Sequence, residues 1–159
     1  MTRTAIALLA LAGAGPARAA DYVTIRQEVI VDRPLAQTWA RIGGFCAIGE
    51  WLKVGCELVS GNGDVGSVRR LNGATIEAMV ARTATSYTYW QSMGAMSATA
   101  YHGTLAAEAV ASGRTRLTYT LFYDQAALAD DGVRASERAR LDTRFAGPLN
   151  EMKRLLEAR

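Results

Sequence analysis

The chain has 159 residues, of which 50% are hydrophobic and 21% are charged, and its formal net charge is +3. These values are ordinary for a soluble globular protein with one domain. They exclude a disordered chain, a collagen-like repeat and a small disulfide-dense protein.

The first residues have the layout of a secretory signal peptide. A basic start at Arg3 is followed by an apolar run over 5–14 and by Ala17-Arg18-Ala19, a small-x-small cleavage site. The apolar run is too short to cross a bilayer as a helix, although a short membrane helix or a mis-assigned start is the alternative. We therefore expect residues 1–19 to be removed. Residues 20–159 would form one domain that is periplasmic or secreted and has no stable membrane anchor.

Signal cleavage would also remove most of the basic character. Arg3 and Arg18 would be lost with no acidic residue, so the net charge would fall from +3 to +1. A nucleic-acid-binding domain normally carries a basic stripe. The basic residues between Arg134 and Arg159 are instead interspersed with acidic ones. The sequence therefore predicts no nucleic-acid partner.

The predicted domain begins with a strand and two short helices. Alternating apolar residues predict a strand over 22–31. Asp32-Arg33-Pro34 is a helix-start signal, and apolar residues repeat at helical spacing from Leu35 to Ile42 until a Gly-Gly pair ends the helix. A second short helix is predicted over 45–51.

Six further strands are predicted, separated by tight turns. Their ranges are 54–60, 66–71, 74–82, 86–93, 98–109 and 114–124. Turn sequences such as Asn72-Gly73 and Ser112-Gly113 lie between them. Successive hairpins at this spacing indicate an antiparallel sheet.

The last segment, residues 135–158, predicts one amphipathic helix. Leu141, Phe145, Leu149 and Met152 recur about one turn apart. Gly147-Pro148 lies inside this helix, so we expect a kink or a break there. A helix with one apolar face must cover one face of the sheet.

Cys46 and Cys56 are the only cysteines. In an exported protein an even count favours a disulfide, and a closed ring of about 11 residues is stabilised by roughly 2.5–3 kcal/mol. Two buried free thiols are the alternative. One histidine and two cysteines fall short of the four ligands that zinc prefers, so neither a metal nor another cofactor is predicted.

The element order and a series of local motifs together resemble the START-like superfamily, also called SRPBCC or polyketide cyclase/dehydrase and lipid-transport proteins. The matching motifs are Val31-Asp32-Arg33-Pro34 with Trp39, Phe45-Cys46-Ala47-Ile48 with Trp51, Cys56-Glu57, residues 66–71, Ile76-Glu77-Ala78-Met79, Tyr87-Thr88-Tyr89 and Tyr101. The resemblance spans essentially all of residues 20–159. It implies an α+β helix-grip fold: a curved antiparallel sheet of about seven strands around a long C-terminal helix, with two short helices after strand one. This superfamily is functionally diverse, so the fold implies little about chemistry.

The resemblance also implies a cavity beneath the long helix, because the Glu of the Ile76-Glu77 motif faces the pocket in similar proteins. Strand side chains alternate between faces, so residues of matching parity would join Glu77 there. The candidate ligand-binding residues are Glu77, Met79, Tyr87, Tyr89, Tyr101, Leu117, Tyr119, Leu121, Phe145 and Leu149. An apolar, tyrosine-rich cavity suits a small, partly polar molecule. Alternatively, the tyrosines are ordinary core residues, and Glu77 is exposed or paired with Arg69 or Arg70.

Two functions remain open. Binding or carrying a small hydrophobic, lipid- or polyketide-like molecule is favoured, because no nucleophilic triad can be assembled around His102, the single histidine. The alternative is a cyclase, dehydratase or isomerase with Glu77 as acid/base, since a carboxyl group in an apolar cavity exchanges protons more readily near neutral pH. Tyr89, Tyr101 or Tyr119 would then orient a carbonyl group.

The outer face of the sheet suggests a further surface. Ile76, Ala78, Val80 and Trp90 have the opposite parity to the candidate ligand-binding residues. If they are exposed together they form an apolar patch, which is typical of a contact surface. We expect a monomer or a weak homodimer. The short connection over 70–74 argues against a long gating loop.

Overall fold

The computed structural model describes residues 19–158. Its elements in chain order are β1 (Tyr22–Val31), α1 (Leu35–Ile42), α2 (Ile48–Trp51), β2 (Cys56–Ser60), β3 (Val68–Leu71), β4 (Thr75–Thr83), β5 (Ser86–Met93), η1 (Ser97–Thr99), β6 (His102–Ala111), β7 (Arg114–Asp124), η2 (Gln125–Ala127) and α3 (Asp131–Glu157). The predicted order of one strand, two helices, six strands and a long helix is confirmed. Nearly all of the expected signal peptide, residues 1–18, lies outside the described residues.

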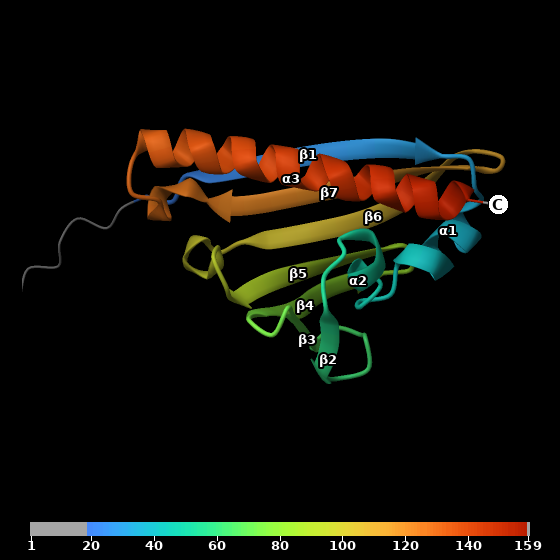
Figure 1. Cartoon of the computed structure of the whole chain (residues 1–159), viewed down its shortest axis with the longest axis horizontal. Coiled ribbons are helices and arrows are strands. Elements are labelled where there is room, and N and C mark those ends of the chain that lie inside the picture. The colour runs from blue at the N-terminus through green and yellow to red at the C-terminus, as the bar shows by residue number, and fades with distance from the viewer. Residues whose placement is uncertain (1–18, 159) are drawn as a thin grey trace, which may run out of the picture.

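The seven strands form one antiparallel sheet that curves around α3 (Figure 1). The strand order is β1-β7-β6-β5-β4-β3-β2, so β1 alone has a neighbour that is distant in sequence. It pairs with β7 from Tyr22 opposite Asp124 to Val31 opposite Thr115. The register shifts twice between β4 and β5, and such bulges increase local bending and twist.

Two predicted boundaries are displaced where short turns replace regular structure. Residues 45–47 form a turn, so α2 begins at Ile48 instead of residue 45. The strand predicted from residue 98 begins at His102, because Ser97–Thr99 form a 3-10 turn. Ala100 then has a φ of 51°, which is incompatible with a β-strand.

Helix α3 is uninterrupted from Asp131 to Glu157 (Figure 1). Of the kink or break predicted at Gly147-Pro148, the break is therefore wrong. The Asp130 side chain accepts a hydrogen bond from the Val133 N–H and caps its first turn. Pro148 is itself buried on the sheet-facing side, beside Leu149. Packing of this face against the sheet holds the helix together across the missing proline N–H.

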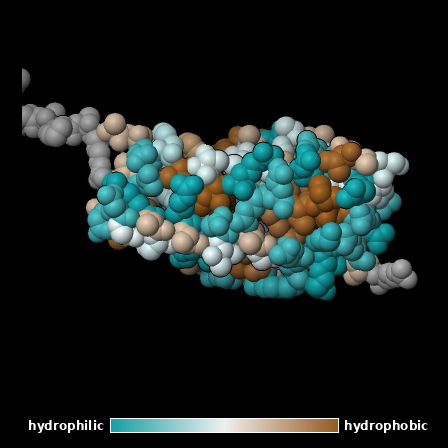
Figure 2. Space-filling view, turned by 90° about the horizontal axis from the view of Figure 1, so that it is seen from above, coloured by the Kyte–Doolittle hydropathy of each residue, from teal (hydrophilic) through white to brown (hydrophobic). Residues whose placement is uncertain are grey.

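The core lies between the inner face of the sheet and α3. Its largest members include Tyr87, Tyr89, Tyr119 and Tyr123, all 2% exposed or less. The side on which α3 and β1 lie is mainly hydrophilic, with hydrophobic areas visible between the polar side chains (Figure 2). Within residues 19–158, no helix has the length and apolar character needed to cross a bilayer.

Candidate functional site

A cavity of about 180 Å³ lies between α3, the inner face of the sheet and residues 46–56, here called the α2 segment. Helix α3 contributes Arg140, Leu141, Arg144 and Phe145 to its wall. Ligand pockets for drug-sized molecules have volumes of about 300–1,000 Å³, whereas an apolar cavity of about 150 Å³ holds one benzene molecule. The cavity is therefore large enough for about one ring with small substituents.

The rest of the wall comes from the sheet and from two loops. The residues of strands β3 to β5 and their connections are Leu71, Asn72, Thr75, Glu77, Tyr89 and Gln91. The remaining residues follow β5 or belong to α2 and the loop after it, and they are Ala95, Met96, Tyr101, Ile48, Leu52 and Val54. The wall thus combines apolar side chains with a small number of polar groups, as is usual in ligand-binding sites.

The structure divides the ten predicted ligand-binding residues into two groups. Glu77, Tyr89, Tyr101 and Phe145 line the cavity. The other six are buried in the packed interior beside it, and they are Met79, Tyr87, Leu117, Tyr119, Leu121 and Leu149. Strand alternation identified the inner face of the sheet, but α3 fills most of the space above that face.

Glu77 lies in the cavity wall and is also paired with Arg69, as one of the alternatives expected. The Arg69 Nε donates to the Glu77 Oε2 at 2.8 Å, and the Arg69 Nη2 lies 2.7 Å from the same oxygen. Arg69 is 0% exposed, and its guanidinium also donates to the Phe45 carbonyl. Its central carbon lies 4.2 Å from the centre of the Phe45 ring and 4.8 Å from that of Tyr89. The ion pair thus joins β3, β4 and the turn before α2.

Only one of the two Glu77 oxygens is engaged by the protein. Both contacts with Arg69 are made by Oε2, and no residue from 19 to 158 donates to Oε1. Oε1 is not among the fully buried polar atoms that lack a hydrogen-bond partner, so part of its surface is accessible. Since the residue lines the cavity, Oε1 is the acceptor that this carboxylate presents to it.

The cavity tyrosines are held as neutral phenols. Burial raises the pKa of Tyr101 and that of Tyr89 well above their ordinary values. The hydroxyl groups of Tyr89 and Tyr119 form a hydrogen bond of 2.8 Å. The rings of Tyr89 and Tyr101 are 6.3 Å apart and tilted. These phenols can give or accept a hydrogen bond but do not carry charge near neutral pH.

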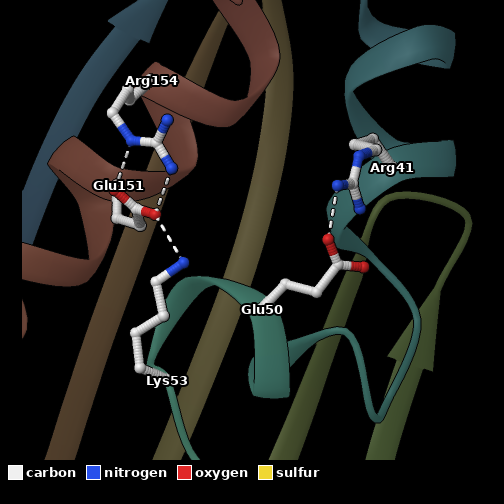
Figure 3. A network of polar contacts seen from close by, with 5 residues as sticks. All are labelled: Arg41, Glu50, Lys53, Glu151 and Arg154. Atoms are coloured by element: carbon white, nitrogen blue, oxygen red, sulfur yellow. Dashed lines mark hydrogen bonds and ion pairs between the residues drawn. The ribbon is translucent and has the colours of Figure 1, made fainter.

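The α2 segment borders one side of the cavity, and ion pairs link it to α1 and to α3 (Figure 3). Glu50 pairs with Arg41 of α1, and the Lys53 Nζ lies 2.7 Å from the Glu151 Oε1 on α3. Arg154 forks onto the same carboxylate at 2.7 and 2.6 Å. These hydrogen bonds from Arg154 and Lys53 lower the pKa of Glu151 to about 2. The connection over 72–74 is short, as expected, and the α2 segment borders the cavity in place of a gating loop there.

A disulfide joins Cys46 to Cys56 across this segment, as the sequence predicted, with a Cα–Cα distance of 5.5 Å. The bridge encloses α2 together with Leu52 and Val54, which line the cavity. Three covalent or ionic links therefore hold the α2 segment in place. Within residues 19–158, no group of three or more His, Cys, Asp or Glu residues could hold a metal ion.

Several wall residues were not among the predicted ligand-binding residues. Thr75 and Gln91 have the same parity as Glu77 and Tyr89, so strand alternation contained the signal for them. Arg140 and Arg144 flank the buried helix positions at 141 and 145, which places them at the border between the helix and the sheet. No periodic signal marks Ala95 or Met96, which lie in an irregular loop.

The outer face matches part of the sequence expectation. Val80 and Trp90 are 43% and 39% exposed, while Ile76 and Ala78 are half-buried. His102 lies on this face, where its ring approaches Phe122 at 6.3 Å. It is therefore not part of the cavity wall.

Comparison with known proteins agrees with this architecture. The model of the family described as polyketide cyclase / dehydrase and lipid transport matches residues 22–157. No curated protein matches the sequence. Among solved structures, the ZhuI aromatase/cyclase from Streptomyces sp. R1128 has a TM-score of 0.71 and 16% identity, over 86% of this chain and 94% of that one.

Two further structures have the same fold. The protein XoxI from Bacillus cereus has a TM-score of 0.71 and 17% identity, over 85% of this chain and 96% of that chain. A protein from Thermobifida fusca has a TM-score of 0.68 and 21% identity, over 84% and 92% of the two chains. The similarity confirms the predicted α+β helix-grip fold.

Proposed function

We propose that this chain, which belongs to the polyketide cyclase/dehydrase and lipid transport family of START-like (SRPBCC) proteins, binds a small, partly polar ring compound in the cavity beneath α3. The observation that carries this proposal is the cavity itself. It is bordered by Tyr89, Tyr101 and Phe145, and Glu77 presents one unengaged oxygen to it. A volume of about 180 Å³ supports a ligand of about one ring more than a long acyl chain or a multi-ring polyketide.

The wall supplies both the attraction and the orientation that such a ligand needs. An apolar ring packed against Tyr89, Tyr101 and Phe145 gains roughly 25 cal/mol for each Å² of apolar surface removed from water, before the cost of association. A hydroxyl or amine group on that ring can donate to the Glu77 Oε1. Because Arg69 fixes the other carboxylate oxygen, the acceptor has a defined position. The ligand would therefore bind in one preferred orientation.

A second candidate function is catalysis of the cyclase, dehydratase or isomerase type. The unengaged Glu77 oxygen supports it, as does the shared fold with an aromatase/cyclase. Arg69 holds the Glu77 Oε2, so Glu77 would act through its unengaged Oε1 as the acid/base. Tyr101, a neutral phenol in the same wall, would donate a hydrogen bond to a carbonyl group. The matched variants are Glu77→Gln and Tyr101→Phe. If they still bind ligand but lose turnover, catalysis is favoured over binding alone.

We also propose that the protein is exported to the periplasm or secreted. The disulfide between Cys46 and Cys56 supports an oxidising compartment, as does the signal-like sequence before residue 20. Fractionation of the native host, followed by mass determination of the mature N-terminus, tests this proposal. A cytosolic protein that retains residue 1 would contradict it.

The binding proposal is tested by nuclear magnetic resonance titration with one-ring phenols. We expect shifts concentrated at amides around the cavity, such as those of Tyr89, Ala95 and Tyr101. The variant Ala95→Trp should abolish these shifts, because Ala95 is an exposed residue of the cavity wall and a bulky ring there would occupy the entrance. Val110→Trp, an exposed site on β6 away from the cavity, is the matched control. Equal shifts in both variants would contradict binding in this cavity.

A further inference from the structure

We propose that the ligand carries a carboxylate, and that Arg144 holds this group at the exposed end of the cavity. This assignment presupposes the ligand binding proposed above and adds the chemical class of the ligand. Arg144 and Arg140 line the cavity from α3 and are exposed, whereas Glu77 is buried at 3% exposure. The buried end of the cavity thus offers a carboxylate oxygen as acceptor, and the exposed end offers guanidinium donors.

The two amide side chains of the wall are oriented by hydrogen bonds from the backbone to their carbonyl oxygens. The Gln91 Oε1 accepts the Met96 N–H at 2.8 Å, and the Asn72 Oδ1 accepts the Gly55 N–H at 2.8 Å. Because a backbone N–H can only donate, these contacts fix which side of each amide is oxygen. Gln91 and Asn72 both belong to the cavity wall, and among residues 19–158 no acceptor receives a hydrogen bond from their NH₂ groups. A ligand rich in acceptors complements them.

The charges around the cavity leave one cation without a partner. Glu77 is neutralised by Arg69. Arg140 forks onto Glu137 of the preceding turn, with the Nε–Oε2 distance at 2.8 Å. Among residues 19–158, no acidic side chain pairs with Arg144 and no acceptor receives its hydrogen bonds. An anionic ligand group would supply this missing partner, and the planar guanidinium favours a carboxylate that can accept two parallel hydrogen bonds.

The two ends together define a class of compound. The buried end accepts through the Glu77 Oε1, which suits a hydroxyl group, and the exposed end donates through Arg144. The volume of about 180 Å³ admits about one ring between them. The structure therefore assigns the site to hydroxylated aromatic acids, in which a hydroxyl and a carboxylate lie on opposite sides of one ring.

The test compares 4-hydroxybenzoate with 4-hydroxybenzamide, which has a similar shape but no charge at pH 7. Both are titrated into the full mature protein and followed by nuclear magnetic resonance shifts of the cavity amides. We expect the acid to bind the wild-type protein about tenfold more tightly than the amide. The preference should shrink as salt is added, because the arginines are exposed.

Three variants assign the preference to one side chain. Arg144→Gln should weaken binding of the acid about fivefold or more and change binding of the amide less than about twofold. Arg144→Lys keeps the charge and should retain more of the acid affinity than Arg144→Gln. Arg138→Gln removes the same charge from the exposed surface of α3 outside the cavity wall, so it should leave both affinities within about twofold.

The outcomes separate this inference from the binding proposal. Equal affinity for acid and amide in the wild type, or an equal effect of Arg144→Gln and Arg138→Gln, overturns the carboxylate assignment and leaves ligand binding standing. Binding of neither compound overturns the binding of one-ring ligands itself. The acid preference with its selective loss in Arg144→Gln supports both.

Discussion

Arg69 is the residue whose surroundings most constrain the site. Its guanidinium is fully buried, pairs with Glu77, donates to the Phe45 carbonyl and lies over three aromatic rings. A buried charge that loses its partner is strongly destabilising, because desolvation is no longer offset by attraction. The position of Glu77 in the cavity therefore depends on a residue that does not itself line it.

We expect Glu77→Leu to reduce the free energy of unfolding by about 3–5 kcal/mol, since it leaves Arg69 buried and unpaired. The double variant Arg69→Met with Glu77→Leu should recover a large part of that loss, because no buried charge remains. Urea denaturation of the two single variants and the double variant measures the coupling. Additive losses would show that the two side chains do not act as a pair in the folded protein.

Gly103 permits the orientation of Tyr89. It lies opposite Tyr89 in the β5–β6 register, and a Cβ atom at this position would lie 2.3 Å from the Tyr89 hydroxyl oxygen and 2.4 Å from the ring carbon that bears it. The Tyr89 ring therefore crosses directly over this glycine. The contacts of Tyr89 with the Tyr101 ring and the Tyr119 hydroxyl depend on that orientation.

We expect Gly103→Ala to destabilise the protein by about 1–3 kcal/mol, which is the usual cost of overpacking a core. It should also displace the Tyr89 ring and reduce binding of the one-ring phenols. Thermal unfolding and the phenol titration measure the two effects. Gly147→Ala, a glycine in α3 with open space around it, is the control, and it should stabilise by about 0.5–1 kcal/mol. Two substitutions of equal and small effect would contradict the packing of Tyr89 over Gly103.

The site could be predicted in part from single residues. The family resemblance placed Glu77 in the cavity, and strand parity then added Tyr89, because a strand that is buried on one face must alternate. Parity could not distinguish Tyr89 from Tyr87, because both are buried on the inner face and only the position of α3 decides which one borders open space. The donors Arg140 and Arg144 escaped prediction for the same reason. Their role depends on where the helix surface meets the sheet.

At the scale of elements, α2 is too short to be stable by itself. It has four residues, and its N-cap makes no side-chain hydrogen bond. An isolated helix needs about 12–15 residues to be even marginal in water. Its position therefore depends on the disulfide, on the ion pairs of Glu50 and Lys53 (Figure 3), and on buried Ile48 and Trp51.

We expect replacement of Cys46 and Cys56 by alanine to lower stability by roughly 2.5–3 kcal/mol, and to weaken binding of one-ring phenols by loosening the cavity wall. Hydrogen exchange should accelerate more at the amides of α2 than at those of β6 or β7. Wild-type protein treated with a reductant should behave like the double variant. Unchanged exchange in α2, with uniform acceleration elsewhere, would show that the bridge acts only on global stability.

The elements that could be predicted from the sequence are those with a clear local periodicity, whereas elements that depend on packing could not. The long strands β1, β5 and β7 match their predicted ranges, because each carries a sustained period of two. The break predicted in α3 is absent, because a proline penalty of about 3 kcal/mol is outweighed by burial of the helix face that includes Pro148. The start of β6 also differed, because the backbone at Ala100 leaves no periodic trace in the sequence.

At the scale of the whole molecule, the interior combines an apolar core with a cluster of phenols. Burial is the largest cause that raises the pKa of Tyr89, Tyr101 and Tyr119 above the ordinary value of 10.0. The folded state therefore keeps their protons at pH values where the unfolded chain loses them. Their contribution is complete below pH 10 and is lost as the pH rises through the folded-state pKa values.

We therefore expect the tyrosine contribution to the free energy of unfolding to be constant up to about pH 10 and to fall above that pH. The slope should be about 1.4 kcal/mol per pH unit for each tyrosine that only the unfolded chain ionises. Urea denaturation between pH 8 and about pH 11.5 measures the slope, and phenolate absorbance shows whether ionisation and unfolding coincide. Tyr101→Phe retains the ring and removes one ionisable group, so its slope should be shallower by that amount. Complete tyrosine ionisation near pH 10 in a protein that remains folded would show that the phenols are accessible to water, and the closed interior on which the binding site depends would then be wrong.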